Sequence, residues 1–451
     1  MKAAVVGGGA SGLIALRTLV EQGCWKEVKV FEASDKIGGT WVYSPTCEET
    51  KFSRPTAMYE NLRTNLPKDC MGFLDFDFPN DLPTFVGHKE VREYLESFVK
   101  RFNLVDNIQL CSVVTDLIPN DTNNPLTGSW TIQWQQSNAS GDMESQQENF
   151  DHVVVCNGHY NTPFIPKIPG ISNFKGEVLH SNTYRTNSKF KDKKVAIIGN
   201  GASASDIGFE IVEVAAEMHH CKREGPSLFN FESKYIQTHK NISRVDDAGN
   251  LLLEDGVVLA DIDYLIYCTG FHYDMPFLQE ERNKIRTAYK RICDLFCHIF
   301  PVNEAHPQYD SNADEPLIPP SIAFVGLPWK ILPFPLFHVQ CLFVARMWAG
   351  VASLPSIVKV RESIAHDIVI RKQQNLPDHY LHCLGMGQFL YCKKLLSMAG
   401  LSKMHAAIDN IEAIAMVTKE IRVSRPADYK DLHLMKENQN WIYKDVDNAL
   451  Q

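Results

Sequence analysis

Two glycine-rich turns constrain the fold of this chain more than any other feature. They occupy residues 7–12 and 199–204, and each follows a short apolar run, at 2–6 and 194–198. Each is followed by a segment with helical apolar spacing, 13–21 and 205–214. A glycine-rich turn between a buried strand and a helix lets the backbone and the helix N-terminus approach a pyrophosphate. The two turns therefore predict an α/β chain with two Rossmann-like dinucleotide-binding domains.

Length and charge narrow the class of protein. A chain of 451 residues is too long for one hydrophobic core, so two or three domains are expected. The net charge of -9 argues against nucleic acid as a partner. The apolar stretch 331–345 is short and carries two prolines, so we expect no transmembrane anchor. We expect a soluble cytoplasmic protein, although the sequence leaves open a leader removed before residue 1.

The cysteines give no sign of a disulfide framework or a metal site. The 12 cysteines are scattered, and no close pair lies near the first glycine turn, as a disulfide reductase would need. Cys293, Cys297 and His298 form a partial metal-like pattern, but no second ligand pair follows them. We therefore expect no metal.

The first turn has the spacing G-x-G-x-x-G. Gly7 permits the tight turn, Gly9 lets the backbone approach the phosphates, and Gly12 lets helix and strand pack closely. The apolar run 28–31 predicts a second strand, which ends in Glu32. A carboxylate there suits a ribose diol, so either FAD or NAD fits this site.

The second turn differs in two ways. Ala204 replaces the third glycine, and Ser203 and Ser205 offer hydroxyls to a phosphate. After the next apolar run, Lys222 and Arg223 occupy the place of the acid in an NAD site. Two cations suit a 2′-phosphate, which predicts NADPH as the ligand.

Further motifs extend this pattern over nearly the whole chain. They lie at 38–41 (G-G-T-W), 59–68 (containing T-N-x-P-K), 156–159 (C-N-G-H), 174–184 (F-x-G-x-x-x-H-x-x-x-Y) and 268–271 (C-T-G-F). In this order they resemble the class B flavin-containing monooxygenases. The resemblance implies FAD at the first turn and NADPH at the second.

The resemblance also implies how the domains are arranged. The NADP-binding domain, 164–275, is inserted into the FAD-binding domain, which comprises 1–163 and 276–451. A linker is expected at 163–169, and the apolar run 322–325 reads as a strand that approaches the flavin. Residues 130–134 alternate like a hairpin strand, whereas the polar stretch 135–149 predicts a loose loop. The helical stretch 345–420 carries no motif.

In that family NADPH reduces FAD, the flavin takes up O2 as a C4a-hydroperoxide, and a soft nucleophile attacks the distal oxygen. By its place in the T-N-x-P-K motif, Asn65 is expected to supply an amide near the flavin and the nicotinamide ribose. His180 and Tyr184 of the fingerprint are the other candidate catalytic residues, and the family places them near the link between the domains. The expected cofactor-binding residues are Gly7, Gly8, Gly9, Ala10, Ser11, Gly12, Glu32, Gly39, Thr40, Trp41, Thr64, Asn65, Leu66, Gly199, Gly201, Ser203, Ala204, Ser205, Asp206, Lys222 and Arg223.

The reaction class is narrowed by Tyr184. The related Baeyer–Villiger enzymes usually have Trp at this place, so Tyr favours N- or S-oxygenation of a small soft nucleophile. The chain is similar to soluble members of the family, including insect N-oxygenases that detoxify pyrrolizidine alkaloids. Baeyer–Villiger oxidation of a ketone and a flavoprotein that binds both nucleotides without transferring oxygen stay open as alternatives. Relatives commonly form homo-oligomers.

Overall fold

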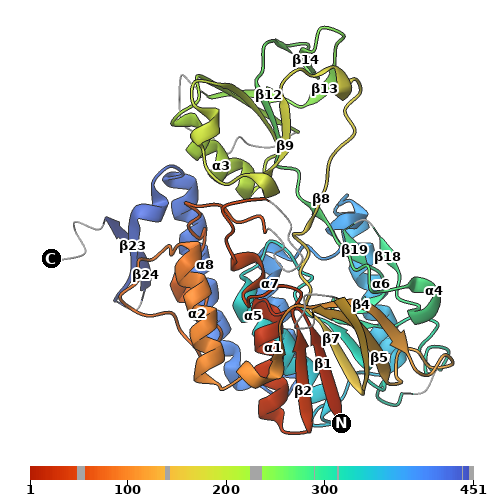
Figure 1. Cartoon of the computed structure of the whole chain (residues 1–451). Helices are drawn as coiled ribbons and strands as arrows, with labels where there is room; N and C mark the ends of the chain where they lie inside the picture. The colour runs from red at the N-terminus through yellow and green to blue at the C-terminus, as the bar shows by residue number, and fades with distance from the viewer. Residues whose placement is uncertain are drawn as a thin grey trace.

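The computed structural model describes residues 1–47, 56–137, 143–223, 236–288, 290–311, 314–438 and 440–445. It has two lobes (Figure 1). The larger lower lobe holds the N-terminus and the C-terminal elements, and the upper lobe is built from the middle of the chain. This arrangement confirms the predicted α/β fold with one Rossmann-like unit inserted into another.

A parallel five-stranded sheet in the order β22-β7-β1-β2-β3 forms the centre of the lower lobe. Its strands are β1 (Lys2–Val6), β2 (Glu27–Phe31), β3 (Ile108–Gln109), β7 (His152–Val155) and β22 (Ile322–Phe324). Because β22 pairs in parallel with β7, the segments before and after the upper lobe share one sheet. We call the lower lobe the FAD unit, after the cofactor that the resemblance implies for its glycine turn.

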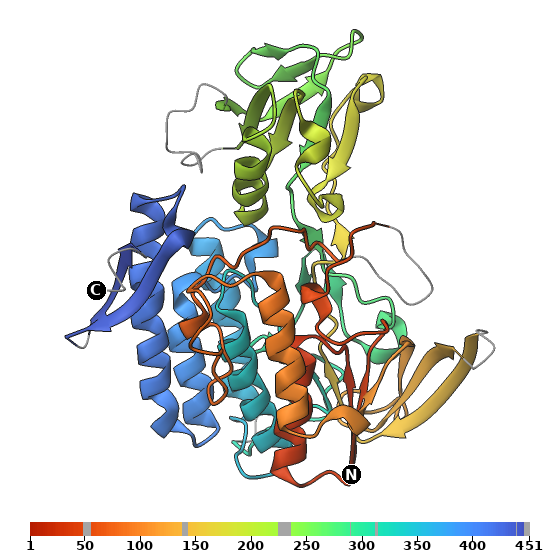
Figure 2. The ribbon, with the colours of Figure 1, turned by 60° about the vertical axis from the view of Figure 1, so that its left-hand side comes forward.

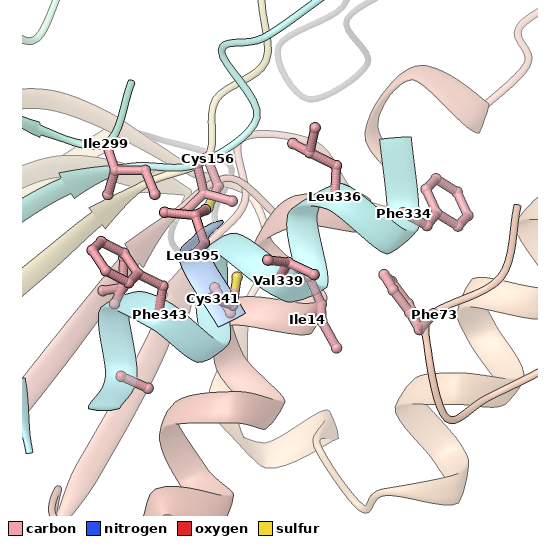
Figure 3. Close-up of a cluster of buried hydrophobic side chains, with 14 of the residues drawn as sticks. Ile14, Phe73, Cys156, Ile299, Phe334, Leu336, Val339, Cys341, Phe343 and Leu395 are labelled. Carbon is pink, nitrogen blue, oxygen red and sulfur yellow. The ribbon is translucent and has the colours of Figure 1, made fainter. Parts of the chain in front are cut away.

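Helices of the FAD unit pack beside this sheet and against one another. They are α1 (Ala10–Gln22), α2 (His88–Arg101), α5 (Pro333–Trp348), α6 (Ile357–Gln373), α7 (Gln388–Met398) and α8 (His405–Ser424). In the core, Ile14 of α1 lies beside Val339 and Cys341 of α5, and Leu395 of α7 lies close by (Figure 3). Within the 345–420 stretch, the buried apolar side chains of α7 and α8 belong to this core. Among the described residues, no helix combines the length and the apolar character that crossing a membrane requires.

The upper lobe repeats the design with the order β12-β11-β10-β16-β9, again parallel. Its strands are β9 (Glu177–His180), β10 (Lys194–Ile198), β11 (Glu217–Lys222), β12 (Ile236–Lys240) and β16 (Tyr264–Tyr267), and its helix is α3 (Ala202–Val212). A small sheet of β13 (Ile242–Val245), β14 (Leu251–Leu253) and β15 (Val258–Leu259) adjoins it. We call this lobe the NADP unit, after the cofactor that the resemblance implies for its glycine turn.

The chain passes between the units twice, at adjacent places. β8 (Thr162–Pro163) leads upward and β17 (Phe271–His272) leads back, and the two pair antiparallel. The domain boundaries expected at 163 and 275 stay predictions.

Further short elements belong to the FAD unit. They are α4 (Glu280–Asn283), β18 (Thr287–Ala288), β19 (Arg291–Ile292), β20 (Leu295–Phe296), β21 (Phe300–Pro301), β23 (Leu432–Glu437), β24 (Asn440–Asp445) and the 3-10 turns η1 (Gly39–Trp41), η2 (Lys68–Cys70) and η10 (Tyr429–Asp431). Figure 2 shows the hairpin of β23 and β24 on the outer side of the helical layer.

The prediction of a loose loop at 135–149 was wrong for the residues that the structure describes. β5 (Trp130–Ser137) and β6 (Met143–Phe150) pair through this stretch, next to β4 (Ser112–Pro119). Polar side chains bond across the strands, for example Gln133 to Gln147 at 3.2 Å. The apolar alternation fades because the ribbon leaves the core beyond Trp134, while its backbone ladder continues. Residues 138–142 lie outside the described part.

Candidate functional site

The first turn is shaped for a close approach of backbone to backbone. Gly7 has φ +105, and a Cβ there would lie 2.6 Å from the carbonyl oxygen of Cys156. A Cβ on Gly12 would overlap the carbonyl oxygen of Gly7. Only glycine fits either position, as the dinucleotide fingerprint requires. The helix α1 begins directly after the turn, at Ala10, so its N-terminus points at the site.

The glycine pair at 38–39 packs onto this turn. The backbone N–H of Gly38 donates to the carbonyl oxygen of Gly8 at 3.0 Å. A Cβ on Gly39 would lie 3.0 Å from Cα of Gly9, so the two glycines face each other without side chains. Thr40 is exposed and Trp41 is partly buried against Phe334. η1 therefore borders the first turn.

Glu32 follows β2 directly and lies at the same place. Its Oε2 accepts a hydrogen bond from the N–H of Gly8 at 2.6 Å, and its Oε1 accepts one from the N–H of Ser34 at 2.8 Å. A buried carboxylate beside the turn is where a ribose diol would be bound. The glycine cradle and Glu32 together fit FAD. When bound, FAD supplies the redox chemistry that these side chains lack.

The second turn has the same backbone but is open to solvent. Gly199 has φ +132, and a Cβ there would overlap the carbonyl oxygen of Cys268. A Cβ on Gly201 would meet nothing within 4 Å, and Ser203 is exposed. Ala204 is fully buried in the core of the NADP unit, so the missing third glycine is accommodated by packing.

Cations gather beside this open turn. Lys222 ends β11 and the exposed Arg223 follows it. Arg223 forms no ion pair or hydrogen bond with another described residue. The register of β11 and β12 places Lys240 beside Lys222, a third cation that sequence reasoning missed. Only the strand pairing, which the sequence does not display, reveals it.

The segment around Tyr59 is one of the parts of the FAD unit that touch the NADP unit. The ring of Tyr59 lies 5.4 Å from that of Tyr184, edge to face. The N–H of Glu60 donates to the carbonyl oxygen of Arg185 at 3.0 Å. The buried Arg185, which sequence reasoning missed, donates through Nη2 to the carbonyl oxygen of Thr56 at 3.0 Å.

Asn65 belongs to the same segment, a few residues further on. Its neighbour Thr64 is anchored in the FAD unit, where its N–H donates to the carbonyl oxygen of Val86 at 2.8 Å. The side-chain amide of Asn65 makes no hydrogen bond within the described part of the chain. Leu66 packs against the main core. Asn65 thus has an unengaged amide in a stretch that contacts both units.

His180 and Tyr184 have every polar atom engaged. His180 donates through Nε2 to the carbonyl oxygen of Gly270 at 3.1 Å and accepts at Nδ1 from the N–H of Asn182 at 3.2 Å. Burial lowers its pKa, which favours the neutral ring. The hydroxyl of Tyr184 donates to Oε2 of Glu210 at 2.7 Å, and burial raises the pKa of Tyr184. Such contacts fix the positions of the two side chains. A catalytic role for His180 or Tyr184 stays a prediction.

Asp206 lies on α3, and its carboxylate forms an ion pair outside the glycine turn. Its Oδ2 lies 3.2 Å from Nζ of Lys430, a residue that sequence reasoning did not single out. Its contact with the nucleotide stays a prediction. Cys293 and Cys297 form no metal cluster with neighbours in the described ranges, and His298 is paired with His382 instead.

Comparisons with known proteins agree with this geometry. The model of the family described as "Flavin-binding monooxygenase-like" matches residues 1–236 and 233–416. Flavin-containing monooxygenase FMO GS-OX5 of Arabidopsis thaliana is 34% identical over 418 residues, which cover 89% of this chain and 85% of that protein.

Two solved structures extend the likeness to three dimensions. S-allyl-L-cysteine S-oxygenase from Allium sativum superposes with a TM-score of 0.80 at 32% identity, covering 95% of this chain and 94% of the other. Tmm from Pelagibacter sp. strain HTCC7211 also gives 0.80 at 22% identity, covering 98% and 96%, and shows the shared fold. These matches confirm the resemblance, the enzymatic nature of the chain and its two cofactors. The chain belongs to the flavin-binding monooxygenase-like family and is a flavin monooxygenase that uses FAD and NADPH.

Proposed function

We propose that this enzyme transfers one oxygen atom of O2 to the sulfur or nitrogen of a small soft nucleophile. The observation that carries this proposal is the unengaged amide of Asn65, in the segment that touches both units. Oxygen transfer needs protection from water and from stray protons more than it needs an acid or a base. An amide can hold both nucleotides in place without adding a charge.

The other residues hold the cofactors. We assign the turn at 7–12, Glu32 and the stretch from Gly39 to Trp41 to FAD. We assign the open turn at 199–205 to the diphosphate of NADPH, and Lys222 and Arg223 to its 2′-phosphate. His180 and Tyr184 keep the edge of the NADP unit in register with its neighbours, since their polar atoms are all engaged.

Sulfur is the first candidate acceptor. The garlic relative, which is named an S-oxygenase, matches 95% of the chain at 32% identity. A tertiary amine nitrogen, including that of a plant alkaloid, is the second candidate. It is favoured over a ketone by Tyr184, because the Baeyer–Villiger enzymes usually have Trp there. A cytoplasmic location and homo-oligomerisation stay predictions.

Product analysis tests the proposal. The purified enzyme is given NADPH and O2 with an alkyl cysteine sulfide, a tertiary amine and a cyclic ketone in parallel, and released hydrogen peroxide is measured alongside. We expect a sulfoxide or an N-oxide formed in proportion to NADPH consumed. A lactone as the main product would establish the Baeyer–Villiger alternative. Peroxide as the sole product with all three nucleophiles would contradict the proposal and favour a flavoprotein that transfers no oxygen.

A further inference from the structure

The C-terminal turn η10 lies between the two nucleotide-binding units. Nζ of Lys430 lies 3.2 Å from the carbonyl oxygen of Arg63 and 3.2 Å from Oδ2 of Asp206. Arg63 precedes Asn65 by two residues, and Asp206 lies on α3, the helix that follows the second glycine turn. One ammonium group therefore joins the Asn65 segment to the helix of the NADP unit.

The turn itself is fixed firmly to the FAD unit. Arg63 donates through Nη1 to Oδ1 of Asp431 at 2.6 Å and through Nη2 to the carbonyl oxygen of Lys430. Tyr429 is buried, and its ring meets that of Phe85 edge to face at 5.2 Å. Lys430 thus projects from a rigid base toward α3, and its bond to Asp206 is the contact of this turn that crosses between the units.

The environment strengthens that ion pair. The side chains of Lys430 and Asp206 are only 19% and 20% exposed. A partly shielded pair is less screened by solvent and salt than a surface pair. The second bond of the ammonium, to the carbonyl oxygen of Arg63, fixes its position and limits the entropy lost in pairing. The match to the family model ends at residue 416, so this turn lies beyond it.

We propose that Lys430 is a positioning residue that sets the distance between the NADP-binding helix and the Asn65 segment, and thereby the alignment of NADPH with the flavin. This rests on the proposed assignment of α3 to NADPH. Hydride transfer depends steeply on the alignment of donor and acceptor. Without the ion pair, α3 still contacts the FAD unit through the hydrogen bond of Asn61 to Glu210 and the packing of Leu62, and the contacts of Tyr59 and Arg185 lie close by. The units therefore stay together with looser alignment.

The test compares Lys430→Gln, Asp206→Asn and the double variant with the native enzyme, each loaded with FAD. Lys430→Arg tests rescue by a second cation. Lys444→Gln is the matched control, since Lys444 pairs with Glu437 inside the hairpin of β23 and β24, which follows η10. The measurements are FAD content, the dissociation constant of NADP+, the anaerobic rate of flavin reduction by NADPH, and peroxide released per NADPH.

We expect Lys430→Gln to keep its FAD and to reduce it more slowly by on the order of 10-fold, with weaker NADP+ binding and more peroxide. Asp206→Asn should give a similar loss, and the double variant no further loss, because both changes break one contact. Lys430→Arg should recover most of the rate, and raised salt should slow the native enzyme more than Lys430→Gln.

A reduction rate within about 2-fold of the native value in Lys430→Gln would overturn the proposal, as would single losses that multiply in the double variant. Loss of FAD from Lys430→Gln would also overturn it, because Lys430 would then serve the FAD unit alone. These outcomes differ from a failure of the proposed function. In that case the native enzyme itself would form no oxygenated product from any of the nucleophiles.

Discussion

Nδ1 of His382 lies 3.1 Å from Nδ1 of His298, deep in the FAD unit. Nε2 of His382 accepts a hydrogen bond from the N–H of Ile292 at 3.1 Å, so the proton of this neutral ring is assigned to Nδ1, where it is donated to His298. Burial lowers the pKa of His298 to about 4 and that of His382 well below its ordinary value. Both rings are therefore neutral in the folded enzyme.

This pair predicts a loss of stability in mild acid. Below the unfolded pKa of 6.5 the unfolded chain binds protons at both histidines, whereas folded His298 binds one only near pH 4. The free energy of unfolding should thus fall as the pH drops from 6.5 toward 4, by about 1.4 kcal/mol per unit of pKa difference for each ring. Thermal unfolding of His298→Gln should depend less on pH over that range. The exposed His366→Gln is the control, and equal slopes for all three proteins would refute the assignment.

Gly12→Ala should abolish FAD binding. The added methyl group would overlap the carbonyl oxygen of Gly7, so the turn cannot keep its shape. We expect a folded but colourless protein, measured by the ratio of flavin to protein absorbance. Gly387→Ala is the control, since a Cβ there meets nothing within 4 Å and its φ is -64. A yellow Gly12→Ala protein would show that the first turn does not hold FAD.

Arg223→Ala should weaken the preference for NADPH over NADH. A charge-assisted bond to the 2′-phosphate contributes roughly 1.5–3 kcal/mol, so the ratio of kcat/KM values should fall at least about 10-fold. Nearly all of that change should appear with NADPH, while the values with NADH stay constant. Arg244→Ala, an exposed arginine of the same unit, should change neither. An unchanged ratio in Arg223→Ala would assign the 2′-phosphate to other cations, Lys222 and Lys240 first.

Asn65→Ala should uncouple NADPH oxidation from oxygen transfer. The side-chain amide is unengaged in the described structure, so its removal should leave the fold unchanged. We expect the yield of oxygenated product per NADPH to fall several-fold while peroxide rises by the same amount. Asn173→Ala, on the surface of the NADP unit, serves as the control. Full coupling in Asn65→Ala would remove Asn65 from the site.

Much of this architecture could be predicted because local rules govern it. The strands at 2–6 and 194–198 match their predicted bounds. A short apolar run directly before a glycine-rich turn is typical of a buried strand, and the turn marks where the strand ends. The helices after the turns begin three residues earlier than predicted, at Ala10 and Ala202, because the last part of each turn already forms helical backbone. The β5–β6 ribbon escaped prediction because hydrogen bonds between backbones, rather than burial, extend it.

The contacts between the units could not be predicted. Lys240 joins the cation cluster through strand register, and Lys430 reaches Asp206 across 224 positions of the chain. Such pairs depend on how two folded units meet, which no periodicity or spacing encodes. The motifs identified residues near each glycine turn. The structure adds the contacts between the two units, such as those of Lys430 with Asp206 and of Tyr59 with Tyr184.

The crossing of the chain at β8 and β17 has a mechanical consequence. Since both connections are hydrogen-bonded to each other, a swing of the upper lobe twists them as a single ribbon and breaks no ladder in either five-stranded sheet. Any rotation of the NADP unit therefore twists both covalent connections together, and the contacts of Tyr59, Glu60 and Lys430 oppose it.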